Sequence, residues 1–157
     1  MSGHRVMRVM KVAAAAIVLA ILCSGCAGRS GHGVQVQVTF VRVPAQDVEL
    51  VAATRTISSD APRARAVLEE LLKGPTAAER AQGLSTLIND GVTVRSVTMD
   101  ATGVIRADFS QRLQDDVGGS MRVLGIRRQI ETTLLDVPGA ISVILSIEGE
   151  TDGILQP

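Results

Sequence analysis

Hydrophobic and polar side chains alternate along residues 34–42, and Pro44 follows two positions later. The hydrophobic positions are Val34, Val36, Val38 and Phe40, and the polar ones are Gln35, Gln37 and Thr39. A period of two places the two sets on opposite faces, so the segment predicts a strand with one buried face. Residues 49–57 are rich in β-branched side chains and predict a second strand.

Two later segments carry apolar residues at intervals of three and four. The first set is Ala64, Val67, Leu68, Leu71 and Leu72, before Gly74-Pro75; the second, within residues 121–135, is Val123, Ile126, Ile130 and Leu134. Such spacing puts each set on one side of a helix, so both segments predict amphipathic helices. Between them, Thr76 and Glu79 have the spacing of a capping box at the start of a short helical turn.

The remaining segments predict three more strands. Residues 92–99 and 104–109 flank a turn at 100–103 and predict a β-hairpin in which Gly103 has a positive φ. Residues 141–147 alternate again and predict the last strand. The order β-β-α-β-β-α-β indicates one α+β domain over residues 34–150, with a mixed or antiparallel sheet of about five strands packed against two helices. A polar tail, 151–157, follows.

The N-terminal segment has the three parts of an export signal. Basic residues and no acidic ones occupy positions 1–11, an uncharged apolar run occupies 12–22, and the small residues Ser24 and Gly25 precede Cys26. The run has the length of a signal-peptide core and is shorter than the roughly 20 residues of a membrane-spanning helix. We therefore expect residues 1–25 to be a lipoprotein signal peptide and Cys26 to be the lipidated first residue of the mature chain.

Cys23 stands where lipoprotein signals usually carry an aliphatic residue. Two other outcomes stay open for this reason: cleavage near Ala27, which would release a secreted domain, and an uncleaved N-terminal anchor. Lipidation would attach two or three acyl chains such as palmitate, and two chains hold a protein stably at a membrane. Residues 26–33 would then be the lipidated cysteine and a Gly/Ser linker, whose seven residues after Cys26 span about 25 Å at most. The expected location is the extracytoplasmic face of the cell membrane.

Composition excludes several classes of function. The whole chain has 16 basic and 16 acidic residues, and loss of the signal removes three basic ones. It has no Trp or Tyr and two Phe, so neither a basic stripe nor aromatic stacking favours a nucleic-acid partner. Cysteine and histidine are both missing after His32. A hydrolytic triad and a zinc site need these residues, so we expect no catalytic residue, no metal and no cofactor.

The carboxylates and one helix start have two interpretations each. Asp115-Asp116 would suit a hydrolase or a cation, but fits a solvated loop better. Glu148, Glu150 and Asp152 have no spacing typical of a calcium loop and fit a charged strand end. Gly118-Gly119-Ser120 would suit an anion at a helix start, or a flexible turn with a Ser N-cap.

Arg55 and Asp108 are the remaining candidate pair. Arg55 interrupts an otherwise apolar strand, and Asp108 lies in another strand just before Phe109. If the two strands are neighbours, the side chains would form a half-buried ion pair. Such a pair is usually structural, and a binding role is the alternative.

Several short segments of the expected domain match the sequence pattern of a known protein module. They are residues 38–42, 52–57, 68–75, 83–84, 104–110, 130–134, 137–141 and 147–150, together with Ile88. The most telling are Leu-Leu-x-Gly-Pro at 71–75 and Asp-Phe-Ser at 108–110. In these segments the chain resembles the GerMN module of sporulation and germination proteins, which occurs in bacterial envelope lipoproteins. The resemblance implies the module's fold and an envelope setting.

These expectations combine into one functional hypothesis. We expect a membrane-anchored envelope lipoprotein, not an enzyme, whose GerMN-like domain binds or assembles with another envelope protein. The alternative is a carrier or sensor lipoprotein for a small ligand, which predicts an enclosed apolar pocket with a few polar groups.

Overall fold

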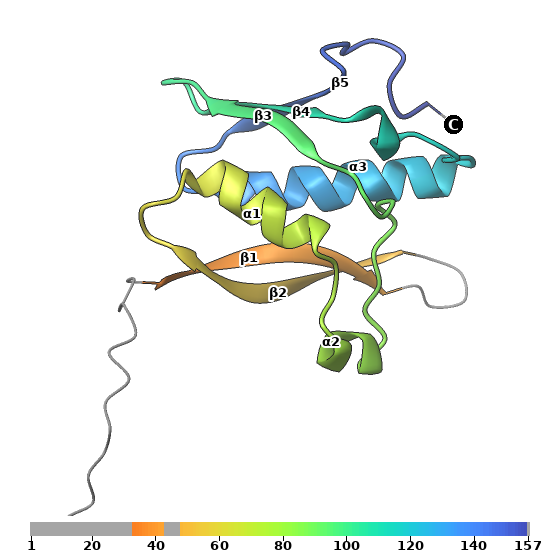
Figure 1. The fold of residues 1–157 in the computed structure, drawn as a ribbon, viewed down its shortest axis with the longest axis horizontal. Helices are drawn as coiled ribbons and strands as arrows, with labels where there is room; N and C mark the ends of the chain where they lie inside the picture. The colour runs from red at the N-terminus through yellow and green to blue at the C-terminus, as the bar shows by residue number, and fades with distance from the viewer. Residues whose placement is uncertain (1–32, 43–47, 157) are drawn as a thin grey trace, which may run out of the picture. The chain divides into compact units, whose positions relative to one another are not determined.

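The computed structural model describes residues 33–42 and 48–156 (Figure 1). The elements in these ranges are β1 Gly33–Arg42, β2 Glu49–Ser58, α1 Arg63–Leu72, α2 Ala77–Ala81, β3 Val94–Met99, β4 Val104–Phe109, the 3-10 helix η1 Gln111–Leu113, α3 Ser120–Leu135 and β5 Ser142–Ile147. The predicted α+β class is confirmed, and so is the order of the strands and the two long helices. The sequence did not predict η1.

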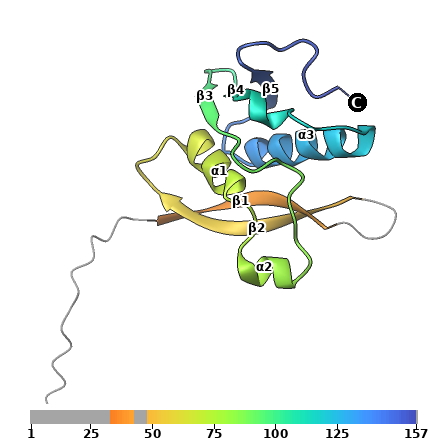
Figure 2. The same cartoon turned by 45° about the vertical axis from the view of Figure 1, so that its right-hand side comes forward.

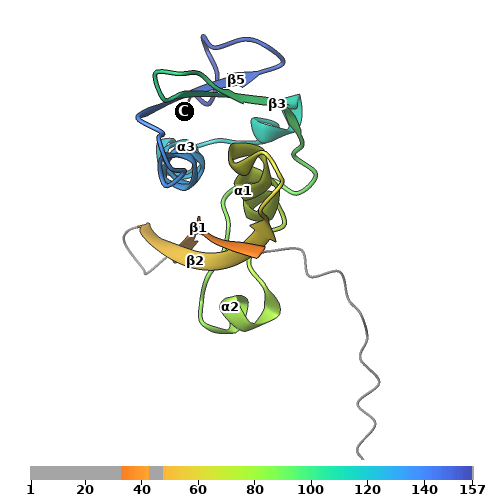
Figure 3. The ribbon, with the colours of Figure 1, turned by 90° about the vertical axis from the view of Figure 1, so that its left-hand side faces the viewer.

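The described strands form two sheets, whereas the sequence had suggested one. β1 and β2 pair antiparallel, and a second sheet has the order β3-β4-β5. α1 and α3 lie as a layer between the two sheets (Figures 1 and 3). The strands divide because each sheet buries one side of its apolar positions against this helical layer.

The second sheet is mixed. β3 and β4 form the predicted hairpin, while β4 and β5 run parallel. Parallel neighbours need a crossover connection, and α3 supplies it between β4 and β5 (Figure 2). This connection holds α3 against the inner side of the sheet.

The turn between β3 and β4 has the conformation that the sequence predicted. Gly103 has a φ of 84°. The Asp100 carboxylate accepts hydrogen bonds from the N–H groups of Thr102 at 2.9 Å and Val104 at 3.1 Å. A further hydrogen bond from the Thr102 hydroxyl is the main reason why the pKa of Asp100 is lowered. A Cβ at position 103 would collide with the carbonyl oxygen of Gly139, so this turn requires glycine.

The predicted capping box is confirmed at the start of α2. Thr76 Oγ1 accepts the N–H of Glu79 at 3.3 Å, and Thr76 N–H donates to Glu79 Oε2 at 2.7 Å. The two predicted apolar helix faces are also confirmed, because the stripe of α3 and three members of the α1 stripe are buried. α2 itself contributes no buried residue, so hydrogen bonds rather than packing hold it in place.

One prediction about β1 is wrong, because the strand is not half exposed along its whole length. Val38–Val41 are all buried, and Thr39 is only 4% exposed. Side chains of α3 cover this polar position: Thr39 N–H donates to Thr133 Oγ1 at 2.9 Å, and Gln129 Nε2 donates to the Thr39 carbonyl at 3.2 Å. Gln129 Oε1 also accepts the N–H of Leu87 at 2.9 Å. The buried Gln129 therefore closes the edge of β1.

Candidate functional site

Arg55 of β2 forms an ion pair with Glu79 of α2. Its guanidinium donates from Nη1 to Oε1 at 2.6 Å and from Nη2 to Oε2 at 2.7 Å, so the contact is bidentate. The Arg55 side chain is 12% exposed and that of Glu79 is 18% exposed. The guanidinium also lies 5.3 Å from the centre of the Phe40 ring. These contacts fasten α2 to the first sheet.

The pair shifts both acid–base equilibria toward the charged forms. The hydrogen bonds from Arg55 lower the pKa of Glu79 from an ordinary value of 4.5 to about 2, and those from Thr76 act in the same direction. The same contact with Glu79 raises the pKa of Arg55. Glu79 is thus a carboxylate with every oxygen engaged, which suits a structural link better than proton transfer.

Asp108 of β4 links the strands of the second sheet. Its Oδ1 accepts hydrogen bonds from the Ser146 hydroxyl at 2.8 Å and from Gly149 N–H at 2.9 Å, while Oδ2 accepts from Arg95 Nη1 at 2.7 Å. Burial alone would raise the pKa of Asp108, but the hydrogen bonds of Gly149 and Ser146 and the charge of Arg95 together lower it. The carboxylate joins β3, β4, β5 and the turn after β5.

Arg55 and Asp108 therefore do not pair with each other. The prediction required neighbouring strands, but β2 and β4 belong to different sheets. Each residue has another partner, Glu79 for Arg55 and Arg95 for Asp108. The sequence contained a signal for the first contact, because the Thr76–Glu79 capping box fixes the position of the Glu79 carboxylate.

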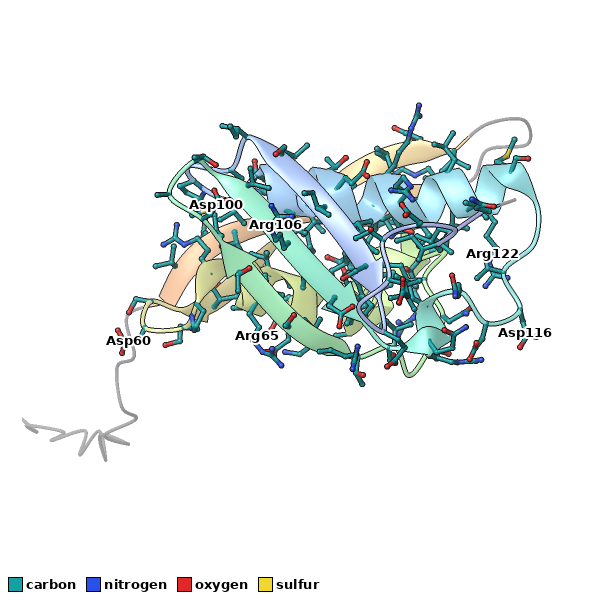
Figure 4. All side chains as sticks on the ribbon, turned by 90° about the horizontal axis from the view of Figure 1, so that it is seen from above. Asp60, Arg65, Asp100, Arg106, Asp116 and Arg122 are labelled. Atoms are coloured by element: carbon teal, nitrogen blue, oxygen red, sulfur yellow. The ribbon has the colours of Figure 1, made fainter. Side chains whose placement is uncertain are left out.

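The other acidic candidates form no metal-binding cluster within the described ranges. The side chain of Asp116 is 95% exposed and approaches Arg112 only to 3.8 Å. Figure 4 shows Asp116 on the loop that leads to α3. Glu148 Oε1 accepts the N–H of Gln111 at 3.1 Å, so it caps η1. Across residues 33–42 and 48–156, no group of three or more His, Cys, Asp or Glu side chains gathers in a way that would hold a metal.

The start of α3 differs from the expected Ser N-cap. Gly119 is the N-cap residue, with a φ of 86° and no capping side chain, and Ser120 is already helical. No acidic residue lies in the first turn of the helix. A helix N-terminus carries a partial positive charge, and nothing in the first turn offsets it here.

An open apolar groove of about 290 Å³ lies between this first part of α3 and the start of β2. Its lining residues are Val48, Leu50, Ser120, Met121, Leu124, Gly125 and Arg128. Met121 is 61% exposed and Leu124 is 48% exposed, although both are large apolar side chains. Gly125 is buried, and a Cβ there would run into the end of the Leu87 side chain. Because Gly125 has no side chain, Leu87 can pack close to α3.

Two apolar residues of α3 outside its buried stripe are the sequence signal for this groove. Met121 and Leu124 lie outside the buried α3 stripe of Val123, Ile126, Ile130 and Leu134. Apolar residues away from the buried face of an amphipathic helix indicate a second surface that excludes water in a complex. The groove is therefore the candidate functional site of the described part of the chain.

Comparison with known proteins defines the family. Residues 29–153 match the model of the Germane family, described as "Sporulation and spore germination". The chain belongs to the Germane family. The match covers most of the sequence, so the resemblance to a GerMN-type domain is confirmed.

Solved structures share the fold of this Germane domain. It is similar to the tandem GerMN domains of the sporulation protein GerM from Bacillus subtilis, with a TM-score of 0.65 and 22% identity over 82% of this chain and 43% of that one. It is also similar to the first GerMN domain of that protein, with a TM-score of 0.61 and 22% identity over 75% and 85% of the two chains. The chain thus spans less than half of the tandem structure. Among curated proteins, no sequence gives a significant match.

The predicted lipidation site of this Germane protein, Cys26, lies outside the residues that the structure describes. Within the described ranges, no helix is both long enough and apolar enough to cross a membrane.

Proposed function

We propose that this Germane domain is a non-catalytic docking module that a lipid anchor on Cys26 holds at the extracytoplasmic face of the cell membrane. Its role there is to bind another protein of the envelope. The observation that carries the proposal is the exposed apolar groove along α3. Complete burial of a Met or Leu side chain contributes roughly 1.5–3 kcal/mol, so covering the exposed halves of Met121 and Leu124 would contribute about 2 kcal/mol together.

The open shape of the groove, rather than its volume, favours docking over the carriage of a small ligand. Pockets for small molecules usually measure roughly 300–1,000 Å³ and enclose most of the ligand. The groove has about 290 Å³ and is open. It therefore fits side chains from a protein surface better than an enclosed ligand.

The acid–base groups of the domain support a non-catalytic role. The two carboxylates with several hydrogen bonds and a charged partner, Glu79 and Asp108, both have a lowered pKa and hold elements of the fold together. A general acid or base would need a pKa near the working pH and an open path to a substrate.

The anchor is tested by labelling the producing bacterium with a radioactive or clickable fatty acid. The wild-type chain should carry the label and sediment with membranes, whereas Cys26→Ala should lose the label and leave the membrane fraction. Label that persists on Cys26→Ala would contradict the assigned lipidation site.

Docking is tested by chemical crosslinking of intact cells, followed by purification of the chain. We expect the same envelope protein to copurify in repeated experiments. If no envelope protein is recovered from cells that produce the folded chain, the docking function is contradicted.

A further inference from the structure

Starting from the proposed docking function, we infer the chemistry of the partner: it presents an apolar side chain next to a carboxylate. The apolar side chain enters the groove of Val48, Leu50, Met121 and Leu124, and the carboxylate pairs with Arg128. The occupant is thus an acidic, apolar segment of a protein.

The apolar part of the groove is suited to one or two large side chains. Val48 precedes β2 and Leu50 lies in it, while the first two turns of α3 supply Met121 and Leu124. A dry cavity of roughly 150 Å³ accepts a benzene ring. A volume of about 290 Å³ therefore has room for an aromatic or aliphatic side chain and a smaller neighbour, but not for a whole helix.

The charge beside the groove is positive. Arg128 is the charged member of the described lining, its side chain is exposed, and within residues 33–42 and 48–156 it makes no hydrogen bond or ion pair. Its neighbour Arg127, by contrast, has Glu131 as a partner at 3.5 Å. Arginine matches a carboxylate with two parallel hydrogen bonds, so Arg128 selects an acidic group.

The first turn of α3 strengthens this preference. It contains no acidic residue and no capping side chain, so the positive end of the helix macrodipole faces the same region. Arg122 lies near this end of α3 (Figure 4) and donates to two neutral oxygens, Asn89 Oδ1 at 2.7 Å and the Asp116 carbonyl at 3.3 Å. Arg122 lines a different hollow, beside Asn89 and Asp90, so the positive charge at the groove comes from Arg128 and the helix start.

The groove lies far from Gly33, the first described residue of the domain. The chain enters the domain at Gly33, at the first end of β1. Leu50 pairs with Val41 at the opposite end of that strand. At 3.3 Å per residue, roughly 25 Å of strand separates Gly33 from Val41. The groove therefore lies near the end of β1 opposite to Gly33, and the test below distinguishes a protein occupant from a lipid.

The test places a photoactivatable amino acid at position 121 of the full chain and irradiates intact cells. We expect one crosslinked envelope protein, and mass spectrometry should map the crosslink to a peptide with an apolar residue within about three positions of an Asp or Glu. Arg128→Glu should lower the crosslinked fraction about tenfold, as expected when a charge pair at an interface becomes repulsive. Reversing the mapped partner carboxylate to Lys should restore it.

Arg106→Glu is the matched control, because Arg106 is exposed on β4 of the other sheet. It should leave the crosslinked fraction unchanged.

A crosslink to lipid, to a second copy of the chain or to a peptide without a carboxylate would overturn the inference, and so would equal effects of Arg128→Glu and Arg106→Glu. If position 121 captures nothing while chemical crosslinking still recovers an envelope protein, the groove inference fails and the docking function stands. If both experiments recover nothing, both fail.

Discussion

Replacing Arg55 by Met removes the ion pair that fastens α2 to β2 and leaves the Glu79 carboxylate without its charged partner. The side chains are mostly buried but not fully, with exposures of 12% and 18%. Exposed ion pairs contribute roughly 0–1 kcal/mol, while breaking a fully buried pair from one side costs roughly 3–5 kcal/mol. A mostly buried bidentate pair lies between these limits. We therefore expect Arg55→Met to lower the free energy of unfolding by about 2–3 kcal/mol.

The coupling between the two residues is measured by urea denaturation of the wild type, Arg55→Met, Glu79→Gln and the double variant. Gln at 79 can still accept the hydrogen bond from Thr76, so the cycle isolates the contact with Arg55. We expect a coupling energy of about 1–2 kcal/mol at pH 7. The exposed i,i+4 pair Arg65–Glu69, at 2.8 Å, is the control and should give about 0.3–0.5 kcal/mol.

The coupling should also depend on pH. The pKa of Glu79 is lowered on folding to about 2, so the folded state binds the proton less tightly than the unfolded state, whose pKa is near 4.5. The stabilisation is complete above pH 4.5 and is lost as the pH falls toward 2. A coupling no larger than that of Arg65–Glu69, or one that stays constant between pH 5 and pH 2, would refute this reasoning.

Substitutions at Asp108, Gln129 and Gly103 test the fold by the same denaturation assay. Asp108→Ala leaves three hydrogen-bond donors without their acceptor and should lower stability by about 2–3 kcal/mol, while Asp108→Asn, which keeps one oxygen, should lose about half of that. Gln129→Leu leaves the backbone of Thr39 and Leu87 unsatisfied inside the protein and should cost about 2–4 kcal/mol; a cost below 1 kcal/mol would mean that water replaces the amide. Gly103→Ala should cost more than about 2 kcal/mol because of its positive φ and the Gly139 carbonyl, whereas the control Gly91→Ala, with a φ of 80° and open space around it, should cost about 1 kcal/mol.

Local signals were enough to predict most elements of the fold. The capping box of Thr76 and Glu79, the hairpin turn at Gly103 and the buried stripe of α3 each depend on residues within a few positions of one another. Each pattern involves only neighbouring positions, so it can be recognised without knowing which distant elements pack together.

Long-range pairing was beyond the sequence patterns. The alternation of β1 does not reveal that Gln129, 90 positions after Thr39, would bind the backbone at the free edge of this strand. Likewise, the sequence of an apolar strand does not show which strand will pair with it. The division into two sheets could therefore not be predicted from β2 or β4 alone. Arg55 and Asp108 were assigned to each other for this reason, although each had a closer partner.

The groove could be predicted only in part from the sequence. Met121 and Leu124 were visible as apolar residues beside the buried face of α3, but only the position of Val48 and Leu50 shows that they line one surface. Exposed apolar side chains are common when they occur singly, so a cluster is informative where a single residue is not.

The central claim is that the groove, rather than apolar exposure in general, binds the envelope partner. The most direct measurement compares partner recovery after crosslinking of intact cells between the double variants Met121→Ser/Leu124→Ser and Met99→Ser/Ile141→Ser. The second pair consists of a Met and an aliphatic residue with comparable exposure, 45% and 70%, outside the groove. With equal amounts of folded chain at the membrane, the groove variant should recover at least about tenfold less partner, and the control should match the wild type. Equal recovery from the two variants would contradict the account.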